Sequence, residues 1–92
     1  MDFIKVENRI YSVNDKNEVI AEITYEEIEK GIYNINHTYV HESLRGQKIG
    51  EKLVKLAIEE IKNRKGKVQA TCSYAKHYLE KTNRKSNDLW KF

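Results

Sequence analysis

A change of hydrophobic period near residue 48 constrains the fold of this chain more than any other feature of its sequence. Before it, apolar side chains alternate with more polar ones over residues 19–25, as in a strand with one buried face. After it, apolar residues recur at helical spacing, namely Ile49, Leu53, Leu56, Ala57 and Ile61. Cations crowd the end of this stretch and Gly66 follows, as is usual at a helix C-terminus. We therefore expect strands before residue 48 and one long amphipathic helix after it.

The N-terminal part of the chain predicts an antiparallel meander. The β-prone residues 9–13 run into the polar cluster 14–17, which suits a hairpin loop. A second strand over residues 19–25 is followed by a polar connection at 26–31 and by a third β-like segment at 32–40. Simple alternation over the third segment places these side chains on one face: Tyr33, Ile35, His37 and Tyr39.

The C-terminal part predicts one more strand, over residues 67–72, and a second helix, over residues 74–81. The polar tail contains Leu89 and Trp90, which are candidates to dock on the domain. The order β-β-β-α-β-α places a helix between two core strands, which suggests a right-handed crossover and a parallel pair. We thus expect an α/β fold of the α+β type, with a mixed and mostly antiparallel sheet, in a single domain over residues 1–92.

Charge is divided unevenly along the chain. The net charge is +3, but residues 1–40 carry 4 basic and 8 acidic side chains, whereas residues 41–92 carry 13 and 6. A basic half suits an anionic ligand such as a nucleotide-like cofactor, although a solvated lysine-rich surface explains it equally well. Lysines alternate with acidic residues along the helix and no RNA-recognition motif is present, so nucleic acid is a weak candidate partner.

No segment predicts export or membrane insertion. The N-terminus lacks a basic region followed by an apolar run, and no stretch approaches the ~18 apolar residues of a membrane span. One cysteine permits no intrachain disulfide, and together with three scattered histidines it matches no zinc-ligand spacing. We expect a cytoplasmic protein that binds no metal.

The segment between the third strand and the long helix, residues 41–50, carries the clearest functional signal. It predicts a tight turn that delivers unpaired N–H groups of the helix to an anion. Gly46 and Gly50 allow close backbone approach, while Arg45 and Lys48 add positive charge. The alternative is a plain strand-to-helix turn whose glycines only relieve steric strain.

This loop and three other segments share the pattern of a known family. The segments are Arg45-Gly46-Gln47-Lys48-Ile49-Gly50, His37-Thr38-Tyr39-Val40, Cys72-Ser73-Tyr74-Ala75 and Tyr78-Leu79-Glu80-Lys81. Together they resemble the short single-domain branch of the GNAT acetyltransferase superfamily, with the first segment as its pyrophosphate loop. The resemblance implies a bent sheet whose strands splay after Val40 and hold acetyl-CoA in the opening. It also implies that the backbone near Tyr39 and Val40 binds the pantetheine arm and that the amides of residues 45–50 bind the pyrophosphate.

The chain departs from the superfamily pattern at several positions. Lys48 stands where the loop usually has its middle glycine, and Cys72 replaces the asparagine that usually follows the next strand. The tyrosine that often serves as general acid falls at Leu79, and Tyr78 cannot be assumed to replace it. The missing proton donor keeps a second interpretation open, namely a non-catalytic acetyl-CoA-binding or sensor module.

Cys72 and His37 are the candidate catalytic residues. Cys72 ends a core strand beside the expected thioester, where a thiol with a lowered pKa could accept the acetyl group; the alternative is a small buried hydrophobe. His37 could act as base for an incoming amine or as the partner that ionises Cys72; the alternative is a core histidine bonded to backbone. Tyr74 and Tyr78 are expected mainly to pack the second helix; the alternative is that they line the acceptor channel.

The sequence therefore predicts an acetyl-CoA-dependent N-acetyltransferase that acts on an amine of a protein or a small molecule. Two routes are open: direct attack by the amine with His37 as base, or two steps through acetylated Cys72. No motif specifies the acceptor. The chain is near the minimum size for the fold, so we expect an acceptor cleft that is shallow or completed by a partner, in a monomer or a weak homodimer.

Overall fold

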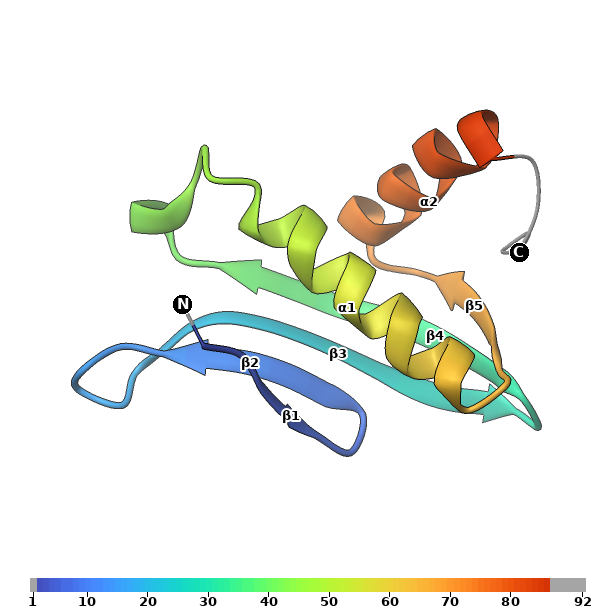
Figure 1. Cartoon of the computed structure of the whole chain (residues 1–92), viewed down its shortest axis with the longest axis horizontal. Helices are drawn as coiled ribbons and strands as arrows, with labels where there is room; N and C mark the ends of the chain where they lie inside the picture. The colour runs from blue at the N-terminus through green and yellow to red at the C-terminus, as the bar shows by residue number, and fades with distance from the viewer. Residues whose placement is uncertain (1, 87–92) are drawn as a thin grey trace.

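A five-stranded mixed sheet forms the framework of the computed structural model, which describes residues 2–86 (Figure 1). Its strands lie side by side in chain order: β1 (Ile4–Val6), β2 (Arg9–Val13), β3 (Val19–Glu29), β4 (Ile32–Val40) and β5 (Lys67–Ala70). The first four strands pair antiparallel, and β5 pairs parallel with β4. The prediction of a mixed, mostly antiparallel sheet is confirmed.

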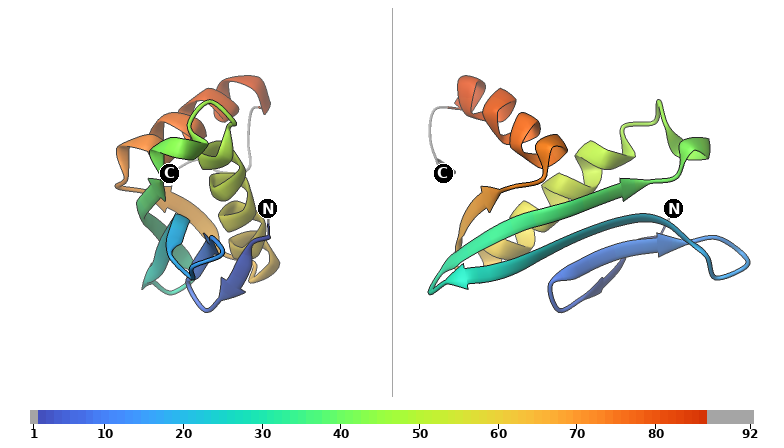
Figure 2. Two further views of the ribbon diagram at one scale, coloured as in Figure 1. Left: turned by 90° about the vertical axis from the view of Figure 1, so that its left-hand side faces the viewer. Right: turned by 180° about the vertical axis from the view of Figure 1, so that it is seen from behind.

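Helices cover one face of this sheet. After β4, a short 3₁₀-helix, η1 (Glu42–Leu44), leads to the long helix α1 (Ile49–Asn63), which returns the chain to the start of β5. Helix α2 (Ser73–Ser86) follows β5 and packs beside α1. Figures 1 and 2 show the helices on what we call the inner face, while the outer face carries no helix in the described chain. None of the helices described is long and apolar enough to cross a membrane.

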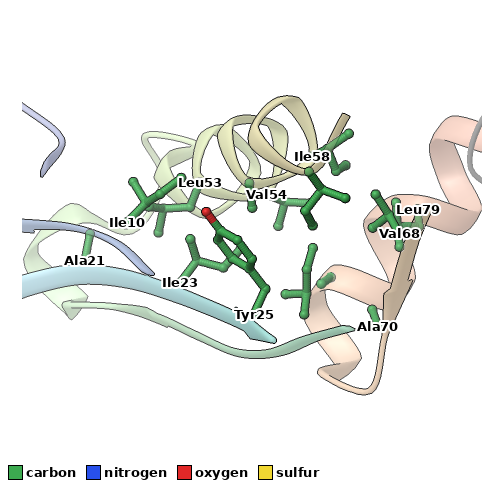
Figure 3. Packing of buried hydrophobic residues seen from close by; sticks show 14 residues of the cluster. Ile10, Ala21, Ile23, Tyr25, Leu53, Val54, Ile58, Val68, Ala70 and Leu79 are labelled. Atoms are coloured by element: carbon green, nitrogen blue, oxygen red, sulfur yellow. The ribbon is translucent and has the colours of Figure 1, made fainter. Parts of the chain in front are cut away.

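The core lies between the inner face of the sheet and the helices. One stripe of α1 is buried there completely or almost completely: Leu53, Val54, Ala57, Ile58 and Ile61. It packs against inward side chains of the strands, among them Ile10, Ile23 and Tyr25 (Figure 3). Ile35 belongs to the same cluster. Burying one large side chain of this kind stabilises the fold by roughly 1.5–3 kcal/mol. The stripe therefore fixes how α1 lies on the sheet and holds its first turn beside the end of β4.

The strand boundaries differ from the sequence prediction. Strand β1 is missing from the prediction because its side chains are all exposed and show no burial pattern. Strand β3 continues through residues 26–29, where we expected a connection, since register shifts let it stay paired with β4. Strand β5 ends at Ala70 instead of residue 72, because the N–H groups of Thr71 and Cys72 both donate hydrogen bonds to the carbonyl of Ile35 and the regular strand pairing stops there.

The helices differ less from the prediction. Helix α1 begins at Ile49, where the period of the apolar residues changes. Helix α2 continues to Ser86, beyond its expected end at residue 81, since neither glycine nor proline interrupts that stretch. Leu89 and Trp90, which are candidates to dock on the domain, lie outside the described residues.

A β-bulge at Asn36 interrupts the alternation of side chains along β4. Ile35 is the register partner of Tyr25, whereas His37 is the partner of Thr24, so Asn36 is an extra residue on β4. The prediction that His37 and Ile35 share one face is therefore wrong. A bulge depends on the pairing with β3, which periodicity within β4 alone does not reveal.

The bulge decides which end residues of β4 face the helices. Thr38 is the register partner of Ile23, a fully buried core residue, so Thr38 and Val40 project to the inner face. His37 and Tyr39 project to the outer face. The end of β4 thus presents alternate side chains to two different environments.

Candidate functional site

A cavity opens between the end of β4 and the first turn of α1. Its volume is about 350 Å³, and it is lined by Thr38, Val40, Leu44, Arg45, Gly46, Lys48, Ile49, Gly50 and Tyr74. Small-molecule sites commonly begin at about this size. The cavity, which we call the donor cavity, gathers most of the residues expected to bind acetyl-CoA. Of that expected set, Gln47 and Tyr39 do not belong to the lining.

The turn at residues 45–50 leaves the start of α1 open to a ligand. Gly46 and Lys48 have positive φ angles, +88° and +58°, which redirect the chain sharply before the helix. Lys48 is the N-cap residue of α1 and makes no side-chain capping hydrogen bond. The first N–H groups of the helix therefore have no partner within it, and the helix dipole adds partial positive charge there. This arrangement is typical of an anion-binding turn.

Lys48 holds a backbone conformation that glycine adopts without strain. Its φ of 58° and ψ of 30° lie in the left-handed region, where a side chain costs roughly 1–2 kcal/mol. The loop thus keeps a glycine-like backbone at the position where the resemblance expects glycine. The Lys48 side chain adds a second cation to the cavity, beside Arg45. Neither cation forms an ion pair within the described residues.

Strands β4 and β5 part halfway along β4. Their paired register ends at Ile35 and Ala70, whereas β4 continues to Val40. In the described chain, residues 37–40 pair with β3 alone. Their other edge can bond an extended ligand beyond Thr38, whose backbone N–H bonds to the sulfur of Cys72. The expectation that the strands part after Val40 is wrong by several residues, because the chain leaves β5 early to begin α2.

Cys72 occupies the N-cap position of α2. Its carbonyl accepts the N–H of Lys76 at 2.9 Å, as the first helical hydrogen bond requires. Its sulfur lies 3.5 Å from the hydroxyl oxygen of Thr38 and accepts hydrogen bonds from the backbone N–H groups of Ala75, Tyr74 and Thr38. Burial acts to raise the pKa of this thiol, but the hydrogen bonds outweigh burial and the pKa of Cys72 is lowered overall. At neutral pH this sulfur is therefore ionised more often than that of a free cysteine.

His37 lies on the outer face, away from Cys72. Its side chain is 55% exposed, and its Nε2 atom is 3.6 Å from a carboxylate oxygen of Glu22. The next residue, Thr38, projects inward and contacts Cys72. The hypothesis that His37 ionises Cys72 is therefore wrong, because the bulge turns the imidazole to the other face. The imidazole is open to an amine that approaches the outer face.

Tyr74 lines the donor cavity, although its position in the sequence mainly predicts helix packing. Its ring reaches from α2 to α1, where a β-carbon on Gly50 would lie 2.7 Å from the tyrosine hydroxyl oxygen. Burial, the Glu51 carboxylate and Tyr78 together raise the pKa of Tyr74, so the hydroxyl remains a hydrogen-bond donor at neutral pH. The signal that could have revealed it is its place in the first helical turn, two residues after Cys72.

Comparison with known proteins identifies the fold that carries this cavity. Residues 9–89 match the model of the GCN5-related N-acetyltransferase family. The chain belongs to this family. A GCN5-like protein from Staphylococcus aureus, solved in solution by NMR, is 40% identical to it with a TM-score of 0.75, over 90% of this chain and 81% of that protein.

More distant structures share the fold alone. The IAA acetyltransferase from Bacillus cereus is 20% identical with a TM-score of 0.64, over 80% of this chain and 52% of that one. A chain of the NatC complex bound to Gag peptide and CoA is 21% identical with a TM-score of 0.66, over 83% of this chain and 56% of its own. No protein with curated function matches the sequence.

Acetyltransferases of this family use acetyl-CoA as the acetyl donor. The residues of the donor cavity fit that molecule. The open N–H groups of α1, together with Arg45 and Lys48, match the charge of a pyrophosphate. The free edge at Tyr39 and Val40 matches the amide groups of a pantetheine arm.

Proposed function

We propose that this acetyltransferase transfers the acetyl group to an amine, and that it does so through Cys72. One observation carries the proposal: the Cys72 thiol caps α2, has a lowered pKa and contacts Thr38, which lines the donor cavity. A cysteine ionised at a helix N-terminus is suited to nucleophilic attack. We further propose that residues 1–92 act as one acetyl-CoA-binding domain.

In this proposal the donor cavity binds acetyl-CoA, which supplies an acetyl group activated as a thioester. Arg45, Lys48 and the first N–H groups of α1 bind the pyrophosphate, and Gly50 permits its close approach. The backbone of Tyr39 and Val40, on the free edge of β4, binds the pantetheine arm. The side chain of Tyr39 takes no part in this, because it projects to the outer face.

Cys72 acts in two steps. Its thiolate bonds to the acetyl carbon while the bond from that carbon to the sulfur of coenzyme A breaks, and solvent protonates the departing thiolate. A neutral amine then bonds to the acetyl carbon, Cys72 leaves as thiolate, and the amine nitrogen loses a proton. Thr38 and the first N–H groups of α2 stabilise the sulfur as an anion before the first step and after the second. His37 on the outer face is the candidate acceptor of the amine proton.

Intact-protein mass spectrometry tests the covalent step. Incubation with acetyl-CoA alone should add one acetyl group to the wild-type chain and none to Cys72→Ala. Turnover with an amine should fall by about a hundredfold or more in Cys72→Ala, since the nucleophile is removed. Full turnover in Cys72→Ala, together with a large loss in His37→Ala, would instead establish direct attack with His37 as base.

One observation favours a second candidate function, an acetyl-CoA-binding module without turnover. Leu79 stands where the superfamily usually has its tyrosine acid, so no hydroxyl is present at that position. The leucine side chain is fully buried in the core. Calorimetric titration combined with the acetylation assay separates the two candidates. Acetyl-CoA binding that is lost in the Arg45→Ala/Lys48→Ala variant, without acetylation of Cys72 or of any amine, would support the binding module.

A further inference from the structure

The outer face of the sheet carries an ordered row of polar and aromatic side chains. Strand register aligns Tyr11, Glu22 and Tyr39 across β2, β3 and β4. Directly paired residues of antiparallel strands project to the same face, so these side chains are neighbours. The right-hand view of Figure 2 shows this face from behind α1, with the strands toward the viewer.

Glu22 is the centre of this row and is held in place. Only 20% of its side chain is exposed, and one carboxylate oxygen binds the guanidinium of Arg9. Arg9 in turn stacks on the ring of Tyr11 at 3.9 Å from its centroid. The other carboxylate oxygen, Oε1, lies 3.6 Å from Nε2 of His37. This second oxygen is thus oriented toward the imidazole that could receive a proton from an amine.

A second cavity begins where the row ends. Its volume is also about 350 Å³, and it is lined by Asn14, Glu18, Val19, Ile20, Tyr39, His41 and Ser43. Glu18 is the one carboxylate in this lining, and no lysine or arginine belongs to it. The side-chain amide of Asn14 donates to the Glu18 carboxylate at 2.9 Å, which orients the acid.

The donor cavity and the second cavity lie on opposite sides of the end of β4. Thr38 lines the donor cavity, whereas Tyr39 and His41 line the second one. Two ligands can therefore approach the same segment from two faces. Beside it, the ladder between β4 and β5 ends at Ile35, whose carbonyl accepts the N–H of Cys72 at 3.2 Å. The gap between the strands thus begins next to the proposed nucleophile.

We propose that the outer face binds the acetyl acceptor, and that this acceptor is a flexible aliphatic amine with a second positive charge. The inference rests on the proposed transferase function. The second ammonium group binds Glu18 in the cavity, the carbon chain crosses the ring of Tyr39, and the reacting amine lies near Glu22 and His37.

Acceptors of equal chain length test the charge preference. Putrescine has an ammonium group at both ends, n-butylamine has one, and γ-aminobutyrate has a carboxylate at its far end. With acetyl-CoA, the wild-type protein should acetylate putrescine and the longer spermidine with kcat/KM about tenfold or more above that for n-butylamine, and use γ-aminobutyrate least. Equal kcat/KM for putrescine and n-butylamine would overturn the proposal.

Glu18→Gln tests the cavity itself with nearly unchanged shape. The variant should raise KM for putrescine about tenfold and affect n-butylamine much less, because only the diamine uses the carboxylate. Glu59→Gln is the matched control, since it removes the same charge from an exposed position on α1. Equal effects of the two substitutions would overturn the proposal, because net charge alone would then explain them.

Direct binding distinguishes failure of this inference from failure of the proposed function. Titration of putrescine into the CoA-saturated protein should shift the NMR signals of Tyr39 and His41, and should do so much less in Glu18→Gln. Such shifts without acetyl transfer to putrescine would retain the amine site and reject the transferase. Transfer to all amines alike, without these shifts, would retain the transferase and reject the site.

Discussion

Replacing Gly50 by alanine tests the contact between α1 and α2 at the donor cavity. The new β-carbon would lie 2.7 Å from the hydroxyl oxygen of Tyr74 and 2.8 Å from Cζ of its ring. Ordinary contacts begin near 3.4 Å, so the end of the ring must retreat by about 0.7 Å. The Tyr74 side chain is 45% exposed and can rotate slightly. The strain stays below the roughly 0.5–1.5 kcal/mol of a 30° departure from a rotamer.

The helix propensity of alanine has the opposite effect on stability to the strain at Tyr74. Alanine is favoured over glycine within a helix by roughly 0.5–1 kcal/mol, and Gly50 is the second residue of α1. We therefore expect the free energy of unfolding to change by no more than about 1 kcal/mol. The donor cavity, in contrast, loses space at two lining residues and the close backbone approach at the anion-binding turn. We expect the Kd for acetyl-CoA to rise by about tenfold or more, which corresponds to ~1.4 kcal/mol.

Urea unfolding measures the change in the free energy of unfolding, and calorimetric titration measures the Kd for acetyl-CoA. The double variant Gly50→Ala/Tyr74→Ala is the control, because removing the ring relieves the contact and should restore part of the affinity. A loss of stability above about 2 kcal/mol would refute the reasoning, since it would mean that the ring cannot move. An unchanged Kd would refute the assignment of this cavity to the acetyl donor.

Two further predictions concern the core and the nucleophile. Tyr25→Phe should raise the free energy of unfolding by about 1 kcal/mol in urea, because the buried hydroxyl has no hydrogen-bond partner within the described residues; destabilisation would contradict this. Thr38→Val should raise the pKa of Cys72, because a hydrogen bond to the sulfur is lost. The thiolate reacts with iodoacetamide, so the alkylation rate increases with pH through the pKa, and its midpoint should move to higher pH in the variant. An identical pH profile would exclude the Thr38 hydroxyl as a cause of the lowered pKa, since the variant keeps the backbone N–H of residue 38.

Local patterns were sufficient to predict the elements on which the donor cavity is built. The apolar stripe that begins at Ile49 defines α1, and Gly46 with the cations beside it defines the turn before the helix. Both features arise within a few consecutive residues, because helical spacing and tight turns depend on neighbours in the chain. The cavity lining accordingly contains most of the residues expected from the sequence.

Pairing between strands, in contrast, decided the position of the catalytic candidates. The bulge at Asn36 exists only because β4 pairs with β3, and it sends His37 to the outer face. The early end of β5 makes Cys72 the cap of α2 and brings its sulfur to Thr38. Neither arrangement has a local signature, since each depends on residues far apart in the chain.

The sequence by itself determined the order of the main elements, the turn at residues 45–50 and the identity of the single thiol. Tertiary structure decided on which faces of the sheet the reactive groups lie. It also placed the ring of Tyr74 against Gly50 and formed a second cavity that Glu18 lines. The physical reason is how far apart in the sequence the interacting residues lie. Helix periodicity and turns arise from neighbouring residues, whereas strand register, helix contacts and cavities arise from segments that meet only in the folded chain.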